Sequence, residues 1–148
     1  MVGCNKYGVK MAVGIKVGSI IDEIGTSDFF HSFFSTISYH LENSKWGKNY
    51  PYLMNKFYQG RISPEEAISV IDELKMIQKK LKGYKPDKVI WDIENLSKKP
   101  PWGKNISSDI SSLANYFVTS TGKDLFEVLF EVFNASIDES KPVEIVQY

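Results

Sequence analysis

Two carboxylates spaced two residues apart, Asp92 and Glu94, are the first candidates for acid–base or metal chemistry in this 148-residue sequence. If Lys88–Ile93 forms a strand, alternate side chains share one face, and both carboxylates point the same way. Such pairs bind divalent metals or transfer protons. A metal-dependent nuclease core would also need a Glu-x-Lys sequence on the following strand, and Glu94-Asn-Leu does not supply it. We therefore favour a solvated strand end or a turn-capping carboxylate, and keep a metal-dependent enzyme as the weaker alternative.

Other enzyme signatures are missing from the sequence. The two histidines, His31 and His40, are nine residues apart on one predicted helix, which is not the spacing of a helical metal pair. Cys4 has no catalytic context, and there is no phosphate-binding loop, dinucleotide fingerprint or Gly-x-Ser-x-Gly turn. We predict a protein that is not an enzyme, with no catalytic residue, no cofactor and no bound metal.

Acidic residues form a line on the last predicted helix: Asp124, Glu127, Glu131 and Asp138. Their offsets of 0, 3, 7 and 14 place them on one face, beside Phe126 and Phe130. One interpretation is a solvated face over a core helix. The alternative is a docking surface for a basic partner, steered by charge and anchored by the aromatic side chains.

The tetrapeptide Trp-Gly-Lys-Asn occurs twice, beginning at Trp46 and at Trp102. The flanking residues differ, so a duplicated unit is not indicated. Each copy is predicted to be a loop leading into a helix, with glycine permitting the turn and asparagine able to cap. We expect each tryptophan to seal an edge of the core, with a partly exposed partner anchor as the alternative.

Hydrophobic periodicity predicts the elements of the first half. Met11–Val17 alternates with period two and is predicted to be a strand. Thr26 or Ser27 begins a helix to about Leu41 with a broad aromatic stripe, and the wheel places its hydroxyl residues opposite that stripe: Ser32, Ser35 and Thr36. A short helix over 52–58 follows Pro51, and a capping box, Ser63 with Glu66, begins a helix to about Lys82.

The second half is predicted to contain two strands and two helices: a strand over 88–93, a helix from about Ser107, a helix over 123–137 and a strand over 143–146. The order β-α-α-α-β-α-α-β predicts an α+β fold, about five helices packed on a small three- or four-stranded sheet. Residues 1–10 are expected to form a leader, with Met11 as an alternative start, and 11–148 a single domain.

Composition restricts the partners and the compartment. No apolar run approaches the roughly 20 residues of a membrane-spanning helix, so no membrane partner is expected. The single cysteine favours a reducing compartment, hence the cytoplasm. Net charge is zero and Arg61 is the single arginine, which argues against nucleic-acid binding. Residues 1–104 hold 16 basic against 11 acidic residues, and 105–148 hold 2 against 7, which permits two faces of opposite potential.

Several phrases in order, WGKNYPYLMNKFYQG, KVIWDIENL, PPWGKN and NYFVTSTGKDLF, resemble the immunity proteins of bacterial polymorphic toxin systems, specifically immunity protein family seventy. The resemblance extends from about Met11 to Val146. It implies a small cytoplasmic α+β antitoxin without catalysis, made beside a secreted or contact-delivered toxin. Such a protein binds its cognate toxin domain and blocks or distorts the active site. A small non-catalytic adaptor or regulator is the alternative.

The resemblance brings no binding residues with it, so the contact surface is a hypothesis from the residues themselves. Toxins that act on nucleic acids present basic clefts, which an acidic face with aromatic edges complements. The first candidate is the acidic line of Asp124, Glu127 and Glu131 with Phe126 and Phe130. The second candidate surface combines the tryptophan loops with two carboxylates: Trp46, Trp102, Asp92 and Glu94.

Overall fold

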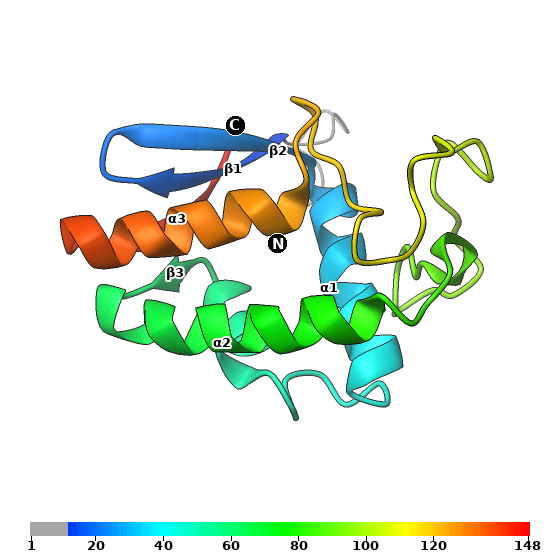
Figure 1. The fold of residues 1–148 in the computed structure, drawn as a ribbon, viewed down its shortest axis with the longest axis horizontal. Coiled ribbons are helices and arrows are strands. Elements are labelled where there is room, and N and C mark those ends of the chain that lie inside the picture. The colour runs from blue at the N-terminus through cyan, green and yellow to red at the C-terminus, as the bar shows by residue number, and fades with distance from the viewer. Residues whose placement is uncertain (1–11) are drawn as a thin grey trace.

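The computed structural model describes residues 12–148. A four-stranded antiparallel sheet organises the fold (Figure 1). β1 (Ala12–Val17) and β2 (Ile20–Thr26) form a hairpin, and β4 (Val143–Gln147) pairs with the other side of β1. β3 (Arg61–Ile62) pairs with β4, which gives the order β2-β1-β4-β3. The predicted first and last strands are confirmed. The expected leader and the alternative start lie outside the described residues.

β2 has no counterpart in the sequence-based prediction. Two of its isoleucines, Ile20 and Ile21, are exposed at the edge of the sheet, so burial does not follow the alternation of a half-buried strand. The pairing with β1 also shifts register between Val13 and Gly14. A shift of this kind interrupts the period of two on which strand prediction depends.

α1 (Ser27–Leu41) begins at the predicted cap, where the Thr26 hydroxyl accepts the Phe29 N–H at 3.2 Å. Its phenylalanines enter the core and make edge-to-face contacts with aromatic residues from other elements. Phe33 contacts Phe117 and Phe126, and Phe30 contacts Phe57. The aromatic stripe therefore joins α1 to segments far away in the sequence.

The short helix after Pro51 is a π-helix, η1 (Tyr52–Phe57), whose first N–H groups are held by a side chain from elsewhere. The Glu73 carboxylate accepts the N–H of Leu53 at 2.8 Å and that of Tyr52 at 3.3 Å. Burial of Glu73 raises the pKa of its carboxyl group, and these two hydrogen bonds oppose that rise. Glu73 thus ties η1 to the following helix.

α2 (Pro64–Leu81) carries the predicted capping box, with Ser63 and Glu66 bonding reciprocally to backbone N–H groups. The Lys56 ammonium also binds Glu66, and this contact, followed by the bonds to Ser63, lowers the pKa of Glu66 to about 2. α3 (Leu125–Glu139) confirms the last predicted helix and lies between the hairpin and α2 (Figure 1).

The predicted strand over 88–93 is wrong. The Thr36 hydroxyl accepts the Ile90 N–H at 3.1 Å and donates to the Ile90 carbonyl at 3.2 Å. Ser32 donates to the same carbonyl at 2.9 Å, and Ser35 accepts the Ile93 N–H at 3.2 Å. The three hydroxyl residues are buried, because their side chains form the hydrogen bonds that a neighbouring strand would otherwise make with the backbone of Ile90 and Ile93.

The predicted helix from Ser107 is also wrong, although its apolar residues Leu113 and Phe117 are buried as expected. The Leu113 N–H bonds to the Tyr84 carbonyl at 3.0 Å, and Asn115 accepts two backbone N–H groups through its side chain. Residues 89–124, which we call the irregular segment, contain no helix and only an isolated bridge between Val118 and Asp124. It projects to one side of α1 (Figure 1).

The α+β class is confirmed, whereas the predicted count of about five helices and their order are wrong, because residues 12–148 contain four helices and a further single 3-10 turn. Residues 12–148 contain three α-helices, the π-helix η1 and one turn of 3-10 helix, η2 (Pro86–Lys88). None of the helices in this range is long and apolar enough to cross a membrane.

Candidate functional site

Asp92 lies where the irregular segment crosses α1, and its carboxylate is already engaged. One oxygen is 3.4 Å from His31 Nε2 and accepts the Glu94 N–H at 2.9 Å, and the other is 3.6 Å from Lys98 Nζ. His31 Nδ1 is in turn hydrogen-bonded to the Tyr58 hydroxyl at 2.9 Å. Burial raises the pKa of Tyr58, with Glu94 and Asp92 adding to the effect.

This geometry corrects the prediction that Asp92 and Glu94 share one face of a strand. The two residues form a turn in which Asp92 caps the Glu94 N–H, and the Glu94 side chain is exposed. Across the described part of the chain, no group of three or more His, Cys, Asp or Glu residues could hold a metal ion. The proposed metal-dependent enzyme depended on both carboxylates lying on one face of a strand, and the turn does not provide that arrangement.

Trp46 seals the edge of the core, as expected. Its Nε1–H donates to the Met54 carbonyl at 2.7 Å, and its ring lies edge-on to Tyr58 with centroids 4.9 Å apart. The same ring stacks with His31 at 6.0 Å. Trp46 is therefore fixed within the structure, which leaves little of it for a partner.

The loop containing Trp46 is organised by a residue that the sequence-based reasoning did not single out. This residue is Glu42, which is only 1% exposed. Its carboxylate accepts hydrogen bonds from three backbone N–H groups: Gly47 at 2.9 Å, Asn49 at 2.9 Å and Tyr50 at 3.0 Å. The available signal was an acidic residue at a helix C-terminus, where the helix dipole disfavours negative charge. Such a residue requires donors from elsewhere.

Trp102 is the more accessible of the two repeated tryptophans, with 38% of its surface exposed. Its Nε1–H donates to the Tyr116 hydroxyl at 2.8 Å, and its ring lies edge-on to Trp91 at 5.3 Å. No helix follows this second loop, so the prediction of a helix-leading loop is wrong here. In the first loop, Pro51 rather than Asn49 precedes the helical turn.

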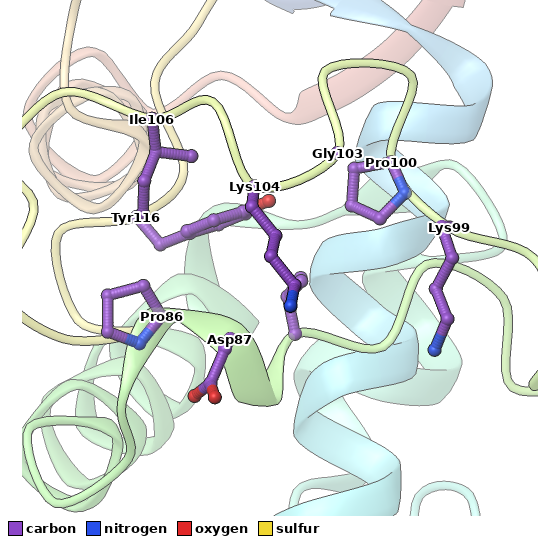
Figure 2. A pocket seen from close by; sticks show the side chains of 9 residues that line it. Pro86, Asp87, Lys99, Pro100, Gly103, Lys104, Ile106 and Tyr116 are labelled. Atoms are coloured by element: carbon purple, nitrogen blue, oxygen red, sulfur yellow. The ribbon is translucent and has the colours of Figure 1, made fainter.

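A pocket of about 480 Å³ opens beside Trp102, between η2 and the irregular segment (Figure 2). It is lined by Pro86, Asp87, Val89, Lys99, Pro100, Gly103, Lys104, Ile106 and Tyr116. The walls are mostly apolar, and the lysine ammonium groups and one carboxylate supply the charge. No periodic pattern in the sequence indicated this pocket, because its residues meet through turns rather than through a helix face or a strand.

The acidic line on α3 is partly confirmed as a surface feature. Glu127, Glu131 and Asp138 are exposed. Asp124 differs, because it precedes α3, and its Oδ1 atom is buried and has no hydrogen-bond partner among residues 12–148. Burial raises the pKa of the Asp124 carboxyl group above its ordinary value.

Phe126 cannot serve as the predicted partner anchor, because it is 0% exposed and contacts Phe33 in the core. Phe130 is half-buried and packs against the same core. The apolar stripe of α3 is wider than one helix face because α3 is covered on two sides, by the sheet and by α2 (Figure 1).

An acidic groove of about 220 Å³ lies between α3 and the β1–β2 hairpin. Three acidic residues line it, Asp22, Glu131 and Glu139, around apolar residues from both elements. Ile20 is 64% exposed at the groove and takes the place that Phe126 was expected to hold as an apolar contact. The hairpin turn and the C-terminal end of α3 lie at the opposite end of the molecule from the irregular segment (Figure 1).

Comparison with known proteins relates the chain to a protein family. The family model described as Immunity protein 70 matches residues 15–145, which covers most of the sequence, including the irregular segment. No curated protein and no solved structure matches the chain.

Proposed function

The chain belongs to the Immunity protein 70 family, and from this premise we propose that it is an antitoxin that binds and neutralises a cognate toxin domain. The family match over residues 15–145 is the observation that carries the proposal. In this role the protein acts in the bacterial cytoplasm, within a polymorphic or contact-dependent toxin system. It blocks the toxin's active site or distorts it, and performs no catalysis of its own.

The acidic groove and the exposed glutamates of α3 are the proposed toxin contact. Glu127 and Glu131 are exposed on α3, and Asp22 and Glu139 extend the negative charge across the groove. A toxin that cleaves or modifies nucleic acid carries a basic cleft, so this surface accelerates association and favours the correct orientation. Ile20 supplies exposed apolar area within the same surface.

The tryptophan surface is the weaker of the two candidate contacts. Trp46 is fixed by Met54 and Tyr58, and Asp92 is engaged by His31 and Lys98. Only Trp102 and Glu94 of that set remain open to a partner.

The test uses the toxin domain encoded beside this gene, produced in cells with and without this protein. The unaltered chain should restore growth and co-purify with the toxin domain. The double variant Glu127→Lys/Glu131→Lys should remain folded by circular dichroism but lose protection, because like charges then face the toxin's basic cleft. The matched control is Glu65→Lys/Asp72→Lys, which reverses two exposed charges on α2 and should protect fully.

The outcomes test the antitoxin function and the position of the toxin contact separately. If the unaltered chain neither binds nor protects against the adjacent toxin, the antitoxin proposal is wrong. Binding without protection would identify an adaptor instead. Full protection by the Glu127→Lys/Glu131→Lys variant would exclude the acidic surface and move the contact towards Trp102 and Glu94.

A further inference from the structure

The pocket beside Trp102 has a shape suited to a small molecule. Its volume of about 480 Å³ lies within the roughly 300–1,000 Å³ typical of ligand sites. Pro86 and Val89 come from η2 and the residue after it, whereas Pro100 and Ile106 come from the turns around Trp102. These side chains form apolar walls that suit a flat or branched hydrocarbon body.

The walls of the pocket are held in place from both directions. On one side, the hydroxyl of Thr36 bonds both backbone groups of Ile90, directly after Val89. On the other side, Trp102 donates to the Tyr116 hydroxyl, and Tyr116 is only 5% exposed. The pocket is therefore preformed, which reduces the entropy cost of binding.

The polar groups of the pocket are mainly donors. Neither Lys99 nor Lys104 forms an ion pair with an acidic residue in the described range. Figure 2 shows the Lys104 side chain extending across the pocket, between Asp87 and Lys99, with Tyr116 reaching towards it from behind. Asp87 is the one acidic group that lines the pocket.

The Tyr116 hydroxyl adds an uncharged donor. Its oxygen accepts the Trp102 N–H, and its own proton has no acceptor among residues 12–148. Burial raises the pKa of Tyr116, so the hydroxyl stays protonated at neutral pH. The proton is thus available to an oxygen atom of a bound molecule.

We propose that this pocket binds a small organic anion, with an apolar body against the proline, valine and isoleucine walls and a carboxylate or phosphate group held by Lys104, Lys99 and the Tyr116 hydroxyl. Charge-assisted hydrogen bonds to such a group are stronger than neutral ones, so the negative charge determines selectivity. This site is separate from the acidic groove of the proposed toxin contact, which lies at the hairpin turn and the C-terminal part of α3, towards the other end of the molecule (Figure 1).

The experiment screens the full chain against aryl carboxylates and aryl phosphates, each paired with its neutral amide or alcohol of the same shape. Binding is followed by ¹H–¹⁵N chemical shifts, including the Trp102 indole N–H, and quantified by calorimetry. We expect members of the anionic set to shift Gly103, Lys104 and the Trp102 indole, and to bind at least about tenfold more tightly than their neutral partners.

Two variants test the donors. Lys104→Met keeps the aliphatic stem and removes the charge, and should weaken binding of the anion at least about fivefold. Tyr116→Phe removes the hydroxyl and should also weaken it. The matched control, Lys75→Met, removes an exposed charge on α2 and should bind the anion as the unaltered chain does.

The proposal is overturned if no anion shifts the pocket resonances, or if neutral partners and Lys104→Met bind equally well. A growth assay with the adjacent toxin separates this site from the antitoxin function. Lys104→Met should protect fully while losing the anion. Loss of protection by this variant would assign the pocket to the toxin contact and overturn the small-molecule assignment.

Discussion

The two Trp-Gly-Lys-Asn loops have the same four residues and different structures. In the first, Gly47 is buried, and the Glu42 carboxylate accepts hydrogen bonds from three backbone N–H groups of the loop. In the second, Gly103 is exposed, and the Trp102 indole has a single hydroxyl partner. Both glycines have positive φ, 79° and 59°. The tetrapeptide therefore specifies a turn, whereas residues outside it determine whether that turn is part of the core or of the surface.

The largest expected effect comes from removing the carboxylate that organises the first loop. Glu42→Ala leaves the N–H groups of Gly47, Asn49 and Tyr50 without their acceptor, and two of these bonds are buried. We expect the free energy of unfolding to fall by about 3–5 kcal/mol, measured by urea denaturation. Glu42→Gln keeps the shape and one acceptor oxygen, so it should cost less. A loss below about 1 kcal/mol for Glu42→Ala would show that the loop is not organised by this residue.

Alanine in place of each glycine gives the next effect and compares the loops directly. Both substitutions force a side chain into a left-handed backbone conformation, at about 1–2 kcal/mol. At Gly47 the added Cβ would also lie 2.6 Å from Asn55 Cγ, whereas nothing lies within 4 Å at Gly103. Gly47→Ala should therefore destabilise more than Gly103→Ala, by about 1 kcal/mol in thermal or urea unfolding.

The control for this comparison is a double-mutant cycle. Asn55→Ala removes the clashing side chain, so Gly47→Ala in that background should cost about the same as Gly103→Ala. An unchanged excess cost in the double variant would mean that the clash is not the cause.

The smallest expected effect compares the tryptophans themselves. Trp46→Phe removes the donor to the Met54 carbonyl and leaves space at the core edge, and should cost about 1–2 kcal/mol. Trp102→Phe removes a bond at a partly exposed site, and should cost less than about 1 kcal/mol. Fluorescence from the remaining tryptophans during denaturation measures both. Equal costs would contradict the assignment of one tryptophan to the core and the other to the surface.

The same contrast explains which elements could be predicted from the sequence. β1, α1, α2, α3 and β4 bond their own backbone groups within helices or to adjacent strands, and their side chains follow the matching period. The capping signals at Thr26 and Ser63 were correct because they depend only on residues nearby in the chain. Local pattern was sufficient for these five elements, but not for β2, whose backbone also bonds in a ladder while its burial does not alternate.

The prediction for the irregular segment was wrong because its backbone hydrogen bonds are not those of a helix or a strand ladder. The apolar spacing before Phe117 resembles a helix, and burial of Leu113 and Phe117 agrees with it. The backbone nevertheless uses the Asn115 side chain and the Tyr84 carbonyl, which no periodic pattern encodes. The backbone of Ile90 was equally unpredictable, because its hydrogen-bond partners are hydroxyl groups more than fifty residues away in the sequence.

The candidate site was predictable only in part. The exposure of Glu127 and Glu131 followed from helical geometry, whereas Phe126 was misplaced because α3 is covered on two sides. Asp22 reaches the acidic groove through β2, an element with no strand signal. The pocket beside Trp102 could not be predicted, since turns assemble it from residues up to thirty positions apart, from Pro86 to Tyr116.

The hydroxyl groups of α1 have a consequence for how sequences related to this one can vary. Within residues 12–148, the hydroxyls of Ser32, Ser35 and Thr36 bond to the backbone of Ile90 and Ile93, and every residue except proline offers the same N–H and carbonyl groups. Mutations that change side chains along the outer surface of the segment therefore leave its attachment to α1 intact. The side chains on that surface can therefore vary without loss of the attachment, whereas replacing a hydroxyl residue of α1 would release the segment.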